Sequence, residues 1–168
     1  QFKKWRLISF EERQSYLFAL EKILLTEKEN LGLLITQDMN KPISQSIAEI
    51  EKCAGLCRYY AEITNPLTVE LVETSWNISE VHHEPLGVIL GVMPWNYPFW
   101  QVLRFAIPTL LAGNAVVLKH ASNCLNSGDA IERIFNEAGF PLGLFHHLHL
   151  RHSEVEELIE QPEIRGVS

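Results

Sequence analysis

The stretch from residue 86 to the end constrains the fold most, because short apolar runs alternate there with helical patterns. Residues 88–92 (VILGV) and 115–118 (AVVL) are continuous apolar runs, typical of strands that are buried on both faces. A helical pattern covers residues 96–112 between them. The alternation continues with a helix at 129–138, a strand at 145–150, a helix capped by Ser153 and a strand at 164–168. This order predicts an α/β fold with a doubly wound, Rossmann-like parallel sheet.

Three amphipathic helices are predicted ahead of this sheet. Ser9 and Glu12 have the spacing of a capping box, and Thr26 with Glu29 repeats that spacing at the second helix. The second helix should end at Lys41, which precedes a proline. The third helix carries an apolar residue at every third or fourth position, at Ile43, Ile47, Ile50, Ala54, Cys57 and Ala61.

A β-ribbon is predicted between the helices and the sheet. Residues 70–74 and 76–84 favour strands but interleave polar side chains, as in a solvated antiparallel pair. We therefore divide the chain into a helical part at 1–66, a ribbon arm at 67–85 and an α/β part at 86–168. The last strand lacks a helix to cover it, so we expect the sheet to be incomplete, with the rest of it and a catalytic domain absent.

Charge and composition exclude several partner classes. The net charge of −7, without a basic cluster, argues against nucleic acid and anionic membranes. No apolar run approaches the roughly 20 residues that span a bilayer. Three cysteines without framework spacing fit a reducing, cytoplasmic setting. Cys53 and Cys57 lie on the apolar stripe of the third helix, and Cys124 has no histidine or glutamate base in a motif relation to it.

The loops after the first two strands hold the candidate site, because ligands of doubly wound sheets bind at the carboxyl ends of the strands. Residues 93–98 (MPWNYP) follow the first strand. Asn96 could cap the next helix or donate its amide into a site, and the residues alone favour the cap. Lys119 could contact a nucleotide or be a solvated strand-end lysine. No glycine-rich G-x-G-x-x-G loop is present.

Several motifs together resemble the aldehyde dehydrogenase superfamily. They are Gly87–Val88, residues 93–98, Pro108, residues 112–119 (AGNAVVLK) and residues 138–143 (AGFPLG). Residues 11–13 and 39–43 extend the similarity over nearly the whole chain. Residues 100–101 and 119–121 are most similar to the succinate-semialdehyde dehydrogenase branch. The resemblance implies NAD- or NADP-dependent oxidation of an aldehyde to an acid, and a homo-oligomer joined through the ribbon arm.

The resemblance also implies roles for individual residues. Asn96 matches the asparagine that donates to the oxyanion formed when a cysteine thiolate attacks the aldehyde. The implied cofactor-binding residues are Met93, Pro94, Trp95, Lys119 and Ser122, and the implied substrate-binding residues are Tyr97, Trp100 and Arg104. The nucleophilic cysteine and the glutamate base of the family lie downstream. The chain by itself is therefore predicted to be inactive.

Two positions bear on specificity. NAD-preferring relatives commonly carry a glutamate where this chain has Ser122, and a small hydroxyl there favours NADP or use of both cofactors. Arg104 shares a helical face with Asn96 and Trp100 by spacing. It could clamp the distal carboxylate of a semialdehyde or be a surface arginine, and the resemblance favours the clamp.

Two further hypotheses come from the remaining residues. Histidines cluster at positions 146, 147, 149 and 152, and imidazoles suit zinc, but ordinary strand and loop histidines are the favoured interpretation and no metal site is predicted. The alternative function is a truncated, non-catalytic remnant that binds nucleotide or mediates oligomerisation.

Overall fold

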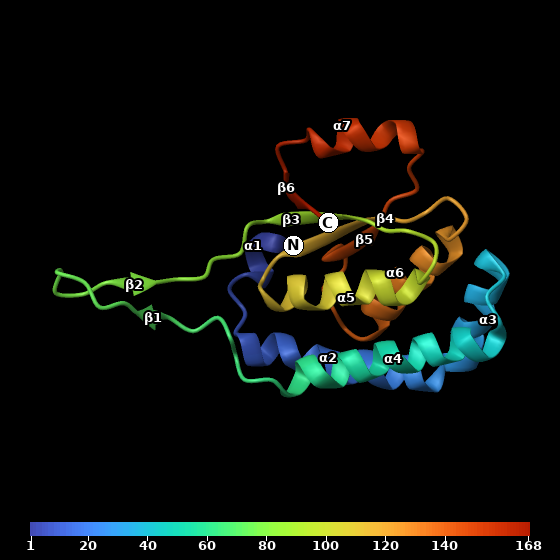
Figure 1. Ribbon diagram of the computed structural model, residues 1–168, viewed down its shortest axis with the longest axis horizontal. Coiled ribbons are helices and arrows are strands. Elements are labelled where there is room, and N and C mark those ends of the chain that lie inside the picture. The colour runs from blue at the N-terminus through green and yellow to red at the C-terminus, as the bar shows by residue number, and fades with distance from the viewer.

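The computed structural model describes residues 1–168 and is built in layers around a parallel sheet (Figure 1). The helices are α1 (Phe2–Trp5), α2 (Phe10–Thr26), α3 (Lys28–Met39), α4 (Ile43–Glu62), α5 (Pro98–Leu111), α6 (Leu125–Glu137) and α7 (Val155–Ile159). The strands are β1 (Glu70–Leu71), β2 (Glu80–Val81), β3 (Val88–Val92), β4 (Ala115–Lys119), β5 (Phe145–His147) and β6 (Ile164–Val167). Helices α5 and α6 lie on one side of the sheet with α2 to α4 beyond them, and α7 lies on the other side.

The sheet has the topology of a doubly wound fold, which confirms the predicted class. Its order is β5-β4-β3-β6, and the pairings of β3 with β4 and β6, and of β4 with β5, are all parallel. The chain therefore proceeds outward from β3 to β5 and then crosses to the opposite side of β3. This reversal between β3 and β6 is the switch point at which ligands of open α/β sheets bind. The loop that follows β3 begins at that point.

One apolar core joins the leading helices to the α/β part. A cluster of 30 buried residues draws members from α2, α3 and α4 as well as from α5, α6 and the strands. Trp5 Nε1 donates to the carbonyl oxygen of Leu110 at 2.8 Å, which ties the first residues to the end of α5. The rings of Phe135 and Phe145 stack with centroids 4.6 Å apart and join α6 to β5. None of the helices combines the length and apolar character that crossing a membrane requires.

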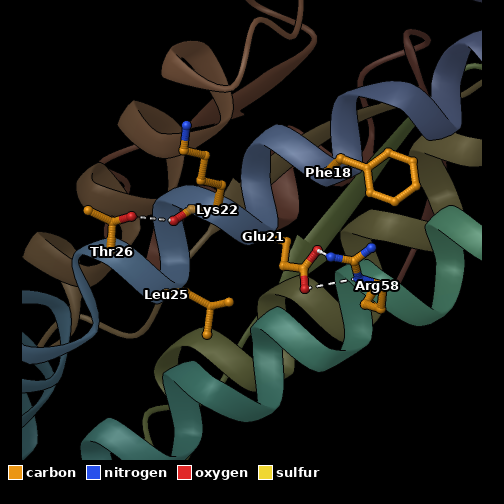
Figure 2. Close-up of a pocket in the computed structure, with 6 residues that line it drawn as sticks. All are labelled: Phe18, Glu21, Lys22, Leu25, Thr26 and Arg58. Atoms are coloured by element: carbon orange, nitrogen blue, oxygen red, sulfur yellow. Dashed lines mark hydrogen bonds and ion pairs between the residues drawn. The ribbon is translucent and has the colours of Figure 1, made fainter.

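Helix α2 begins as expected, whereas the cap assigned to the second helix is wrong. Ser9 accepts a hydrogen bond from the N–H of Glu12 at 3.1 Å. Helix α2 continues through Thr26, and Glu27 occupies the N-cap position of α3 without a side-chain bond. The Thr26 hydroxyl instead donates to the carbonyl oxygen of Lys22 at 2.7 Å (Figure 2). A threonine in the last turn of one helix satisfies a carbonyl of that helix, so it cannot cap the next.

The β-ribbon is shorter than predicted. Strands β1 and β2 pair over two residues each, and the ribbon projects away from the body (Figure 1). Only an isolated two-stranded pair forms there, and such a pair has no third strand or helix to extend it. Trp76 at the ribbon is 80% exposed.

Later boundaries also differ from the sequence-based expectations. Helix α6 begins at Leu125 rather than at Asp129, and β5 ends at His147 rather than at Leu150. The cap expected of Ser153 is not formed, because Arg151 and Glu154 make the capping interactions of the short turn before α7.

Candidate functional site

Five candidate site residues lie in the loop after β3, and four of them are exposed to solvent. Met93 is buried, whereas Pro94, Trp95, Asn96 and Tyr97 are exposed. Helix α5 begins only at Pro98, and Tyr97 is its N-cap without a side-chain hydrogen bond. The N-cap interpretation of Asn96 is therefore wrong. Its side-chain amide makes no hydrogen bond within the molecule, and only its backbone carbonyl is engaged.

Helix α5 is capped by a carboxylate from α4. Glu49 Oε1 accepts hydrogen bonds from the N–H groups of Phe99 at 2.9 Å and Trp100 at 3.0 Å. These are two of the backbone donors that every helix leaves unpaired in its first turn. A negative charge is also favourable at this positive end of the helix dipole. Glu49 therefore fixes where α5 starts, a role that the sequence did not indicate.

Lys41 contacts both Glu49 and the loop before α5. Its Nζ lies 2.5 Å from Glu49 Oε2 and donates to the carbonyl oxygen of Asn96 at 3.1 Å. The side chains of Lys41 and Glu49 are 7% and 1% exposed, so the ion pair is buried. The same ammonium lies 3.8 Å from the centroid of the Tyr97 ring. We call Lys41 and Glu49 the buried pair; together they hold the carbonyl of Asn96 and the start of α5 that follows it.

Residues at the end of β4 also form hydrogen bonds with the loop after β3. Met93 N–H donates to the carbonyl oxygen of Lys119 at 3.0 Å. His120 is buried, its Nε2 lies 3.0 Å from the carbonyl oxygen of Pro98, and its Nδ1 accepts from the N–H of Ala121 at 2.8 Å. Burial lowers the pKa of His120 to about 4, against the opposing effect of the Pro98 carbonyl. The ring is therefore neutral near pH 7, with its proton on Nε2.

Lys119 and Ser122 offer donors at the carboxyl edge of the sheet. Lys119 is the last residue of β4 and is buried, so it is not the solvated strand-end lysine that the residues alone allowed. It takes part in none of the ion pairs of the molecule. Ser122 is exposed three residues later. An ammonium free of carboxylates and a nearby hydroxyl fit the ribose and phosphate groups of a nucleotide, which accept hydrogen bonds and carry negative charge.

Trp100 and Arg104 lie on the first turns of α5, but no contact brings Arg104 to Asn96. Trp100 is half-buried, and Lys52 Nζ from α4 lies 3.7 Å from its ring centroid. Arg104 is exposed and donates to Gln101 Oε1 at 3.0 Å. An open hollow of about 440 Å³ lies beside the loop and is lined by Lys41, Gln45, Ala48, Glu49, Lys52 and Tyr97.

The cysteines are buried thiols rather than exposed nucleophiles. Burial raises the pKa of Cys57 well above its ordinary value and that of Cys124 to about 11. The nucleophilic form of cysteine is the thiolate, so neither thiol is activated near neutral pH. The Sγ of Cys124 lies 3.9 Å from the carbonyl oxygen of Trp95, so this thiol packs against the backbone of the loop after β3.

A second hollow lies on the outside of the helical layer, between α2 and α4 (Figure 2). Glu21 and Arg58 face each other across it, with Glu21 Oε2 and Arg58 Nη2 2.8 Å apart. The guanidinium carbon of Arg58 also lies 5.2 Å from the centroid of the Phe18 ring. None of its lining residues belongs to the loops after β3 and β4, so we interpret it as a structural contact between two helices.

Comparison with known proteins gives one consistent result. The model of the aldehyde dehydrogenase family matches residues 1–168. A probable NADP-dependent succinate-semialdehyde dehydrogenase of Synechocystis sp. is 44% identical over 166 residues, which are 98% of this chain and 37% of that protein. An NAD(P)-dependent succinate semialdehyde dehydrogenase of Escherichia coli is 38% identical over 171 residues, with 99% of this chain and 36% of that protein covered.

The solved structures agree with the sequence relatives. The crystal structure of succinic semialdehyde dehydrogenase from Streptococcus pyogenes, in complex with NADP⁺, superimposes with a TM-score of 0.93 and 33% identity. The superposition covers 99% of this chain and 37% of that one. The chain thus spans little more than a third of the length of the relatives that it matches.

Proposed function

Since the chain belongs to the aldehyde dehydrogenase family, we propose that it forms the N-terminal, cofactor-binding portion of an NAD(P)-dependent enzyme that oxidises a semialdehyde to a carboxylic acid. Succinate semialdehyde is the proposed substrate, since it appears in the names of the relatives described above. The observation that carries the proposal is the free side-chain amide of Asn96 on a backbone held by the buried pair and by β4.

The arrangement suits stabilisation of an oxyanion. Attack of a thiolate on an aldehyde places negative charge on the carbonyl oxygen, and a donor fixed in advance lowers the cost of that charge. Asn96 would supply one N–H from its amide. Because Lys41 and Glu49 fix the backbone from Asn96 to the start of α5, and Lys119 holds Met93 before it, little reorganisation would be needed when the charge develops. A bound NAD(P) would supply the hydride acceptor.

Cofactor binding is proposed for the carboxyl edge of the sheet. Lys119 and Ser122 would contact the adenosine ribose and its substituent, and Met93, Pro94 and Trp95 would face the nicotinamide side. Tyr97, Trp100 and Arg104 would line the substrate side, with Arg104 free to meet a distal carboxylate because its guanidinium is exposed and pairs with no acid. The exposed ribbon, with Trp76 near its tip, would mediate homo-oligomerisation.

The proposed function is tested by an activity measurement on the longer protein that carries this chain. We expect it to form reduced cofactor from succinate semialdehyde. The 168-residue polypeptide alone should form none above a no-enzyme blank, because burial raises the pKa of all three of its thiols, Cys53, Cys57 and Cys124. Activity in neither protein would favour the alternative, a non-catalytic remnant. Activity in the short polypeptide would show that the nucleophile lies within residues 1–168.

Changing Ser122 to Glu should alter cofactor preference in the same longer protein. A carboxylate at this exposed position would repel the 2′-phosphate of NADP and could accept from the ribose hydroxyls of NAD. A like charge held close to the phosphate should cost about 1–3 kcal/mol, a roughly tenfold to hundredfold change in the ratio of kcat/KM for the two cofactors. Ser153→Glu, at an exposed serine in the turn before α7, is the control. An unchanged ratio in Ser122→Glu would mean that residue 122 does not face the ribose.

A further inference from the structure

The histidine-rich segment after β5 meets α6 in a cluster that the proposed reaction does not use. His147 is the last residue of β5, His149 follows two positions later, and Asp129 lies on α6. His147 Nδ1 lies 2.8 Å and His149 Nε2 2.6 Å from the same carboxylate oxygen, Oδ1 of Asp129. One ligand atom from each of the three residues falls within 4.8 Å of the others.

The imidazole of His147 is fixed in place. Its side chain is 0% exposed and packs against α6, where a Cβ on Gly128 would come within 2.4 Å of His147 Cε1. Glu132 Oε2 accepts the backbone N–H of His147 at 2.9 Å, which joins the end of β5 to the same helix. Nε2 of His147 is buried without a partner. Nδ1 faces Asp129 Oδ1 and is the nitrogen that this ring presents to the cluster.

The other two side chains can adjust. Asp129 and His149 are 54% and 53% exposed. Zinc–nitrogen bonds are about 2.0–2.1 Å long, so an ion bound to the fixed Nδ1 of His147 would require the Asp129 carboxylate to swing back and the His149 imidazole to shift toward the ion. A rigid ligand beside two mobile ones permits this rearrangement without a change in the fold.

From this geometry we propose that Asp129, His147 and His149 form a zinc-binding site that joins α6 to the end of β5. Two imidazoles and one carboxylate are ligands that zinc favours, and water can complete a tetrahedral site. The ligand set does not suit Mg²⁺ or Ca²⁺, which prefer oxygen donors. The proposal is independent of the proposed aldehyde chemistry, because none of these residues belongs to the loop of Asn96 or to the Lys119–Ser122 segment.

The test is a titration of the untagged protein with zinc ion, after treatment with a chelator, by calorimetry and by thermal unfolding. We expect one zinc per chain and a midpoint of unfolding that rises with zinc, because a ligand that binds only the folded state stabilises it. Asp129→Asn and His149→Asn should each weaken binding by more than about tenfold, the loss that even indirect partners of a metal cause. Both positions are half-exposed, so these variants should fold; equal circular dichroism spectra would verify this.

His82→Asn serves as the matched control, because His82 is also an exposed imidazole beside a carboxylate, with Nε2 2.9 Å from Glu80 Oε2. It should bind zinc as the unchanged protein does. Absence of stoichiometric zinc binding in the unchanged protein would overturn the proposal. Equal zinc affinity in Asp129→Asn, His149→Asn and His82→Asn would do the same, since it would show that the ion binds scattered surface histidines.

Discussion

Asn96→Ala is expected to lower kcat by about 10²–10³-fold in the proposed enzyme that would contain this chain, the loss that follows removal of one oxyanion donor. The alanine removes the amide but leaves the loop supported, because Lys41 contacts the backbone carbonyl of residue 96 rather than its side chain. Folding and cofactor affinity should therefore change little. The measurement is steady-state kinetics with succinate semialdehyde, together with cofactor binding by fluorescence.

Asn77→Ala is a suitable control, because Asn77 is an exposed asparagine on the ribbon, far along the chain from the loop. It should leave kcat unchanged. If Asn96→Ala retained full kcat with normal cofactor binding, the free amide would have no part in the chemistry. The proposal for this residue would then fail even if the protein were an active dehydrogenase.

Glu49→Ala is expected to reduce the free energy of unfolding by about 3–5 kcal/mol, the usual cost of leaving one member of a buried ion pair alone. The change leaves the ammonium of Lys41 buried without its carboxylate and frees the N–H groups of Phe99 and Trp100. Denaturant unfolding of the protein, followed by circular dichroism, measures the loss.

Glu51→Ala provides the matched comparison on the same helix. Glu51 pairs with Lys28 at 2.6 Å, but their side chains are 47% and 32% exposed. Pairs on the surface contribute about 0–1 kcal/mol, so this variant should change the unfolding free energy little. Equal losses for the two variants would show that Glu49 does not hold the start of α5 in solution.

The regular elements were largely predictable because their signals are local. The apolar run at residues 88–92 became β3 with the expected bounds, and the run at 115–118 became β4 with one more residue. The apolar stripe of the third predicted helix became the buried face of α4 from Ile50 onward, whereas Ile47 is half-buried and Ile43 is 45% exposed. Burial on one face imposes a period on neighbouring residues, and burial on both faces of a strand gives a continuous apolar run; either pattern can be read without knowing what covers the element.

Helix caps and the ends of elements were less predictable. Several polar groups that are close in the folded structure compete to bond the free N–H groups of a helix, and some of them are distant in sequence. The capping-box spacing at Thr26 matches that at Ser9, yet α2 extends through the second position. Asn96 has the residue type of an N-cap, but a carboxylate from α4 already serves the first turn of α5. A local sequence pattern cannot show that a residue distant in sequence already accepts the hydrogen bonds that the predicted cap would accept.

The sequence by itself determined the α/β class, the order of the main elements and the loop in which the candidate donors lie. Only the tertiary structure decided that β6 lies beside β3, that Lys41 and Glu49 support Asn96, and that Asp129 meets His147 and His149. Periodicity is a property of residues a few positions apart. A contact such as Glu49 with Phe99, separated by 50 residues, leaves no periodic trace, because it exists only once the packed core has brought two helices together.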